Sequence, residues 1–188
     1  MIERMIDEVE RCIQNNCYIA ALTIAITLPD SCGKAEYRID ECGKRYINWC
    51  KTYFDELYQP KFNSKYTNDL EYLDGEILYK LRCFLLHEDS LPKTLRIQKD
   101  NRLIDDFVLV VNEDYNNEGL ISVSYNSDGT VAKRRMEINI ILLCRRLCRI
   151  AKKYYEENKD KFDFLEFSFV DRLEWKRNVE KLKNKYSS

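Results

Sequence analysis

The chain has little histidine, glycine or proline, and each shortage excludes certain structures or kinds of chemistry. Its 188 residues include one histidine, five glycines and three prolines. Long flexible linkers are therefore not expected, and a hydrophobic content of 45% is enough for one sizeable core. Any chemistry that needs an imidazole must use His87, because the chain has no other. We expect a mainly helical protein that forms a single domain over residues 1–188.

The chain also lacks an excess of positive or negative charge, and it lacks long apolar runs. The formal net charge is −1 and the pI is about 6.0, whereas a protein that wraps nucleic acid is usually far more basic. A contact with a polyanion must therefore come from a local patch. No stretch approaches the roughly 18 apolar residues of a membrane span, and the charged start of the chain lacks the apolar core of a signal peptide. We expect no membrane partner and a cytoplasmic location.

The patterns that mark metal sites are missing, although the chain has eight cysteines. No two of them form a Cys-x-x-Cys pair, and a single histidine leaves no cluster of zinc ligands in the sequence. We therefore expect neither a metal nor a cofactor. In a reducing cytoplasm the thiols would serve as small apolar side chains of the interior.

The spacing of apolar residues predicts helices at both ends of the chain and a small sheet between them. Pro29 is expected to end the first helical stretch and to be followed by a turn, and Asp74 is a candidate N-cap for the central helix. The predicted helices are one long or two short helices within 2–28, then 45–58, 73–89, about 139–154, and a last one within 164–185. Residues 89–105 are interpreted as a connection. Alternating apolar residues predict strands near 107–111, 120–125 and 136–140, which would form an antiparallel sheet inserted at about 106–140.

The central helix carries the pattern of greatest chemical interest, because it holds Arg82 and, five residues later, His87. Five steps along an ideal helix leave two side chains about 140° apart, although a long arginine can reach around the helix. An imidazole moves protons at neutral pH, and a guanidinium suits phosphate oxygens. Together they could cleave RNA without a metal, with Arg82 stabilising the charge that develops on the phosphate. The alternative is that Arg82 and His87 are ordinary surface residues, or that they cap the C-terminus of the helix, where positive charge is favourable.

Other side chains extend this pattern. Candidates for lining the site are Tyr79, Cys83 and Glu88. A basic stretch follows the predicted sheet, and three of its members are spaced to share one helix face: Arg145, Arg149 and Lys152. This face is a candidate for contacts to an RNA backbone, and the alternative is an ordinary solvated face.

The segment Leu81-Arg82-Cys83-Phe84-Leu85-Leu86-His87 resembles the Arg-x4–6-His signature of the HEPN superfamily, helical proteins that include many RNases. Residues 25–33, 45–49 and 73–76 look like parts of small bacterial HEPN-like proteins, so that the resemblance covers about residues 1–90. It implies a helical bundle that dimerises through the motif helices, and a metal-independent endoribonuclease site in the cleft between the subunits. In this chain Cys83 follows the arginine, where active members often have Asn, Asp or His.

The sequence thus supports two main functional hypotheses, and a third, weaker one is a ligand-sensing protein whose small sheet shapes a pocket. The first is a HEPN-type endoribonuclease that acts as a homodimer on RNA, with Arg82 and His87 as catalytic residues, in a defence or toxin system. The second is a catalytically inactive HEPN-like module that binds RNA or another protein. Neither hypothesis identifies the RNA target or a partner such as an antitoxin.

Overall fold

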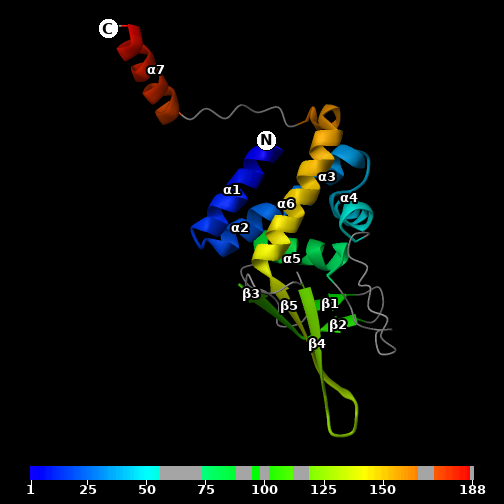
Figure 1. Cartoon of the computed structure of the whole chain (residues 1–188). Helices are drawn as coiled ribbons and strands as arrows, with labels where there is room; N and C mark the ends of the chain where they lie inside the picture. Colours follow the sequence, from blue (N-terminus) through cyan, green and yellow to red (C-terminus); the bar gives the residue numbers. More distant parts are fainter. Residues whose placement is uncertain (56–72, 88–94, 98–101, 112–118, 165–171, 187–188) are drawn as a thin grey trace.

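The computed structural model describes residues 1–55, 73–87, 95–97, 102–111, 119–164 and 172–186. Helices dominate this part of the chain, and a small sheet lies at one end of the helical body (Figure 1). The predicted fold class, mainly helical with a small sheet, is therefore confirmed at this level. None of the helices within the described residues is long and apolar enough to cross a lipid bilayer.

The helices before the sheet are short. They are α1 (Ile2–Gln14), α2 (Tyr18–Ala25), α3 (Leu28–Glu36), α4 (Cys42–Trp49) with a π-helical turn at Cys50–Asp55, and α5 (Gly75–His87). The break between α1 and α2 lies at Asn16, whose φ of 58° is left-handed and therefore ends the helix. The alternative of two short helices within residues 2–28 is thus confirmed. Of the predicted helix over residues 45–58, the last three residues lie outside the described part.

The expectation that Pro29 ends a helix is wrong. Pro29 lies in the first turn of α3, where a missing backbone N–H leaves no hydrogen bond unmade and the fixed φ suits a helix. Residues 30–33 are consequently helical and do not form a turn. This difference matters for the site, because the helix gives Asp30 a fixed position on α3.

The sheet is mixed and not purely antiparallel as predicted. Its strands are β3 (Asp106–Val110), β4 (Gly119–Tyr125) and β5 (Val131–Asn139), in the order β3-β5-β4. β4 and β5 pair antiparallel across a turn in which Gly129 has a φ of 82°, a left-handed conformation that favours glycine. β3 pairs parallel with β5, along the edge of β5 opposite β4. No tight hairpin joins these two strands, and a tight hairpin would make them antiparallel.

Two further strands lie where the sequence was interpreted as a connection. β1 (Leu95–Ile97) and β2 (Arg102–Ile104) form an antiparallel pair. Each has three residues, which is too short for an alternating pattern to be recognised. Strand structure therefore begins before the predicted boundary of about residue 106.

The helix α6 (Ile140–Glu157) is central to the core. It follows β5 directly, and the side chain of Asn139 caps it by accepting a hydrogen bond from the N–H of Leu142 at 3.3 Å. The predicted apolar stripe is confirmed, because its members are all buried: Ile140, Leu143, Cys144, Leu147, Ala151 and Tyr154. Tyr154 meets the buried Trp49 edge to face, with ring centroids 5.8 Å apart.

The cysteines follow the expected behaviour only in part. The described thiols are all free, and four of them are buried: Cys32, Cys50, Cys144 and Cys148. Cys17 is exposed, and three others are intermediate. Burial raises the pKa of Cys148 to about 12, so that this thiol stays protonated at neutral pH and acts as an apolar side chain.

The chain after α6 forms a 3₁₀ turn at Lys159–Phe162 and then α7 (Arg172–Tyr186). Figure 1 shows α7 lying apart from the other helices. The prediction of a last helix within residues 164–185 is confirmed from Arg172 onward, and residues 165–171 lie outside the described part.

Candidate functional site

The N-terminus of α5 is capped as predicted. The backbone N–H groups of Glu76 and Ile77 each donate a hydrogen bond to Oδ1 of Asp74 at 2.9 Å. One face of the helix is buried in the core through Ile77 and Leu78. The cap and the buried face fix the rotation of α5 about its axis and leave Tyr79, Arg82 and Cys83 partly exposed.

Arg82 forms an ion pair with Asp30 of α3. Its Nε donates to Oδ2 of Asp30 at 3.0 Å, and the two side chains are 16% and 18% exposed. Water and salt weaken the attraction within such a partly buried pair less than they weaken a salt bridge on the surface. Burial lowers the pKa of Arg82, but the hydrogen bond and charge of Asp30, with a hydrogen bond to Cys83, outweigh it and raise the pKa above its ordinary value. The guanidinium is therefore permanently charged and held in one orientation.

The second oxygen of Asp30 contacts α4. Its Oδ1 accepts a hydrogen bond from Sγ of Cys42 at 3.5 Å. Burial, followed by the charge of Asp30, raises the pKa of the Cys42 thiol. The thiol is thus protonated at neutral pH and does not have the character of a nucleophile. Asp30 in this way joins three helices, α3, α4 and α5.

Tyr79 and Cys83 lie near Arg82 on α5. The ring of Tyr79 packs against Tyr46, with centroids 5.4 Å apart. This packing needs glycine at position 43, because a Cβ there would lie 2.9 Å from Cζ of Tyr79. Burial, and then the neighbouring Cys83, raises the pKa of Tyr79. We call the five side chains the Asp30 cluster: Asp30, Cys42, Tyr79, Arg82 and Cys83.

His87 is the last residue of α5, and its side chain lies outside the part that the structure describes. Glu88 lies outside it entirely. Along an ideal helix, five residues separate two Cα positions by about 7.5 Å in the axial direction and about 140° around the axis. His87 therefore belongs to the same helix as Arg82 and not to the same stripe of it.

The predicted basic face lies elsewhere on the helical body. Arg145 and Arg149 are exposed on α6, and Nη2 of Arg145 lies 3.4 Å from Oε1 of Glu10 on α1. Arg149 and Lys152 line an open depression of about 380 Å³ beside Ile6 of α1. Because this face is formed by α1 and α6, and the Asp30 cluster by α3, α4 and α5, the structure does not bring the two predicted groups together within one chain.

Arg146, which belongs to the same basic stretch, is part of the core. Only 5% of it is exposed, and its Nη2 donates to the carbonyl oxygen of Phe54 at 2.8 Å. The guanidinium also lies over the ring of Phe54, 4.3 Å from the centroid. Charge in this stretch of sequence therefore does not imply a solvated position.

Asp30 and Cys42 are the site residues that sequence reasoning missed. Asp30 lies directly after Pro29, within one of the stretches that carry the family resemblance, which was the available signal. Its contact with Arg82 spans 52 positions and has no local pattern. Among the described residues, no three His, Cys, Asp or Glu side chains are placed to hold a metal ion together.

Comparisons of the chain with protein-family models, with curated proteins and with solved structures gave no match. The functional conclusion therefore depends on the chemistry of the Asp30 cluster and of the motif helix.

Proposed function

We propose that the protein is a metal-independent endoribonuclease of HEPN type that acts as a homodimer, with Arg82 and His87 as its catalytic residues. The observation that supports this best is the state of Arg82. Asp30 orients its guanidinium at 3.0 Å, and the side chain retains 16% exposure on the helix that ends at His87. A permanently charged and pre-oriented guanidinium, on the same helix as a histidine, suits a reaction in which negative charge develops on a phosphate.

The reaction would be an internal transesterification. The imidazole of His87 takes the proton of a ribose 2′-hydroxyl, whose oxygen attacks the adjacent phosphorus atom. The bond from phosphorus to the 5′-oxygen breaks, and His87 of the second subunit gives a proton to that oxygen. The products are a 2′,3′-cyclic phosphate and a 5′-hydroxyl end, with no net uptake of atoms. Arg82 stabilises the extra charge on the phosphate oxygens.

Asp30 would act as a positioning residue in this scheme. It binds Nε, which is one edge of the guanidinium, and so sets the direction in which the plane of the group faces. Its own contact with Cys42 holds the carboxylate in turn. The basic face with Arg149 and Lys152 would bind the RNA backbone away from the reacting phosphate. The biological setting that we propose is a defence or toxin system of the cytoplasm.

The test is RNA cleavage by purified protein in the presence of EDTA. Wild-type protein should release 2′,3′-cyclic phosphate ends, and His87→Ala should remove the activity while circular dichroism and the oligomeric state stay unchanged. A matched control is Arg38→Lys, since Arg38 also pairs with a carboxylate, Asp163 at 2.6 Å, but on the open surface. If wild-type protein leaves structured and unstructured RNAs intact under these conditions, the proposal is wrong.

The second candidate function is a non-catalytic module that binds RNA or a partner protein through its helices. The Arg82–Asp30 pair favours it in one respect, because a buried pair between α3 and α5 also serves as a structural tie. The presence of Cys83 beside Arg82 favours it as well. This module would bind RNA without cutting it, with an affinity that His87→Ala leaves unchanged.

A further inference from the structure

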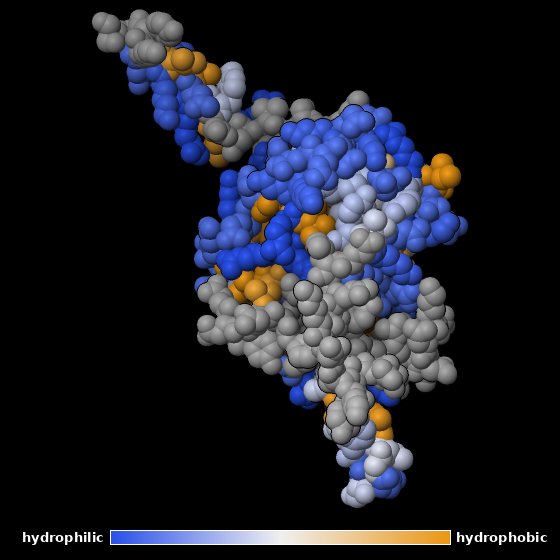
Figure 2. Space-filling model, turned by 45° about the vertical axis from the view of Figure 1, so that its right-hand side comes forward, coloured by the Kyte–Doolittle hydropathy of each residue, from blue (hydrophilic) through white to orange (hydrophobic). Residues whose placement is uncertain are grey.

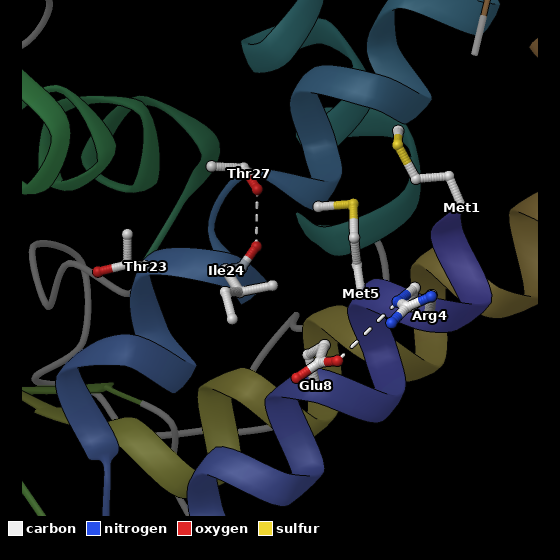
Figure 3. A pocket seen from close by; sticks show the side chains of 7 residues that line it. All are labelled: Met1, Arg4, Met5, Glu8, Thr23, Ile24 and Thr27. Atoms are coloured by element: carbon white, nitrogen blue, oxygen red, sulfur yellow. Dashed lines mark hydrogen bonds and ion pairs between the residues drawn. The ribbon is translucent and has the colours of Figure 1, made fainter. Parts of the chain in front are cut away.

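An open apolar groove lies between α1 and the end of α2. Figure 3 shows the side chains that line it: Met1, Arg4, Met5, Glu8, Thr23, Ile24 and Thr27. Its volume is about 400 Å³, within the range of roughly 300–1,000 Å³ for pockets that bury drug-sized ligands. The groove is therefore large enough for an indole ring together with a neighbouring aliphatic side chain.

The polar side chains that line the groove have partners within their own helix or in the adjoining turn. The hydroxyl of Thr23 donates to the carbonyl oxygen of Ile19, and that of Thr27 to the carbonyl oxygen of Ile24, each at 2.8 Å. Arg4 and Glu8 form an ion pair at 4.0 Å along the rim (Figure 3). The surface offered to a partner is thus mainly methyl groups and methionine, a side chain that adapts its shape and makes favourable contacts with aromatic rings.

The helix α7 offers the complementary surface. Trp175 is 61% exposed and Leu182 is 54% exposed, and with Val179 they are spaced by four and three residues, so they share one face. In Figure 2 the helix shows both hydrophilic and hydrophobic residues, and it lies apart from the body. An isolated helix of 15 residues is only marginally stable in water, so a helix of this length gains most of its stability by packing its apolar face.

The charges of the two elements also match. α7 carries six lysine or arginine residues and two glutamates, whereas α1 carries four acidic residues and two arginines. A basic helix is therefore attracted to α1, and the apolar face of Trp175 and Leu182 can be buried between α1 and α2. Charge complementarity and the apolar groove point to the same docking surface.

We propose that α7 of one chain packs its Trp175–Leu182 face into the α1–α2 groove of a second copy, and that the second copy returns the contact. Exchange of an identical element is a route to two-fold dimers that needs no new surface. The position of α7 supports a second copy as the occupant, because the helix extends away from a body whose own groove is open (Figure 1). This inference does not depend on the proposed ribonuclease activity.

The first test is self-association of the full chain, measured by sedimentation velocity. The double variant Trp175→Ala/Leu182→Ala should raise the dimer dissociation constant by at least about tenfold, because buried aromatic anchors dominate interface energies. Leu173→Ala is the matched control: Leu173 is 65% exposed on the same helix, but it lies nine residues, or about 180°, from Leu182. This control should dimerise like wild type. A wild-type chain that stays monomeric at high concentration overturns the proposal.

The second test identifies the occupant. A photo-cross-linking amino acid at position 175 should give a covalent product of twice the chain mass, joined to the α1–α2 segment. A product of single mass shows that α7 folds onto its own chain and overturns the exchange. Mixing Met5→Glu chains with Trp175→Ala chains should restore association, since each mixed pair keeps one intact groove and one intact α7. Failure to restore it contradicts reciprocal exchange. Loss of RNA cleavage is not a readout here: a chain that dimerises through α7 without cutting RNA contradicts only the proposed function, and a dimer that cuts RNA but cross-links elsewhere contradicts only this inference.

Discussion

Arg146 and Arg82 are both mostly buried, and they differ in what they contact. Arg146 donates to the backbone oxygen of Phe54 and lies over its ring, within the core beneath α6. Arg82 instead pairs with a carboxylate, and Tyr79 and Cys83 lie beside it on a partly exposed face. The first arrangement attaches the guanidinium to the core through one backbone hydrogen bond and one ring contact. The second orients the group by one edge, which is what a residue that meets a phosphate needs.

The same substitution at both positions should separate these roles, and the largest effect is expected at Arg82. Arg82→Lys keeps the charge but loses the planar fork and the Nε bond to Asp30. RNA cleavage should fall by about 10²–10³-fold, the usual effect of removing one preorganised donor to a developing oxyanion. The rate is measured with excess RNA at fixed salt, and the melting temperature is recorded for the same sample. An unchanged cleavage rate would contradict a catalytic role of Arg82 and would mean that Arg82, like Arg146, has only a structural role.

Arg146→Lys should give the opposite result. Lysine cannot both stack on Phe54 and donate to its carbonyl, so the free energy of unfolding should fall by about 2 kcal/mol, the worth of a charged hydrogen bond with a cation–π contact. For a chain of this size that corresponds to a melting temperature lower by about 4–8 °C. The cleavage rate per folded molecule should stay at the wild-type level. A thermal melt followed by circular dichroism is the measurement.

A smaller effect is expected at the carboxylate that distinguishes Arg82 from Arg146. Asp30→Asn keeps an oxygen that can accept from Nε but removes the charge that orients the guanidinium. We expect cleavage to fall by about tenfold through the rate of the bound complex and not through RNA affinity, as for a small misplacement of a reacting group. Separate measurement of kcat and KM tests this. A change confined to KM would show that Asp30 affects binding and not positioning.

The contrast between the two arginines also shows what the sequence could predict. The stripe of α6 and the cap at Asp74 were predictable, because a helical period and an N-cap are local patterns. The Asp30–Arg82 contact was not, because it joins residues 52 positions apart. The burial of Arg146 was hidden as well, since neighbouring residues Arg145 and Arg149 on the same helix are exposed and the three share one charge.

Pro29 and the sheet show a different kind of error. The rule that disfavours a helix before proline competes with the preference of proline for the first turn of a helix, and the second effect determines the start of α3. The parallel pairing of β3 with β5 depends on how the chain passes the sheet, which no local alternation encodes. Both errors concern the direction that the chain takes between elements and not the type of the elements.

The smallest expected effect concerns Asp55, a partly buried carboxylate whose charge the fold disfavours. Asp55 lies near Asp74 at the start of α5, and burial, then the charge of Asp74, raises its pKa from 3.8 to about 6. The carboxyl group of Asp55 therefore holds its proton more tightly in the folded state than in the unfolded state. As the pH rises from about 4 to about 6, ionisation of Asp55 progressively lowers the stability of the fold. Asp55→Asn should therefore stabilise the fold by about 1 kcal/mol at pH 7, a value reduced for partial solvent screening.

The pH dependence of this gain distinguishes charge from packing. The melting temperature of Asp55→Asn should exceed that of wild type by about 2–4 °C at pH 7, and the difference should shrink as the pH falls to 4, where Asp55 of the folded protein is protonated. Asp7→Asn, at an exposed position of α1, is the control and should show no such trend. A gain that stays constant from pH 4 to pH 8 would mean that packing of the amide, and not removal of a destabilising charge, explains it.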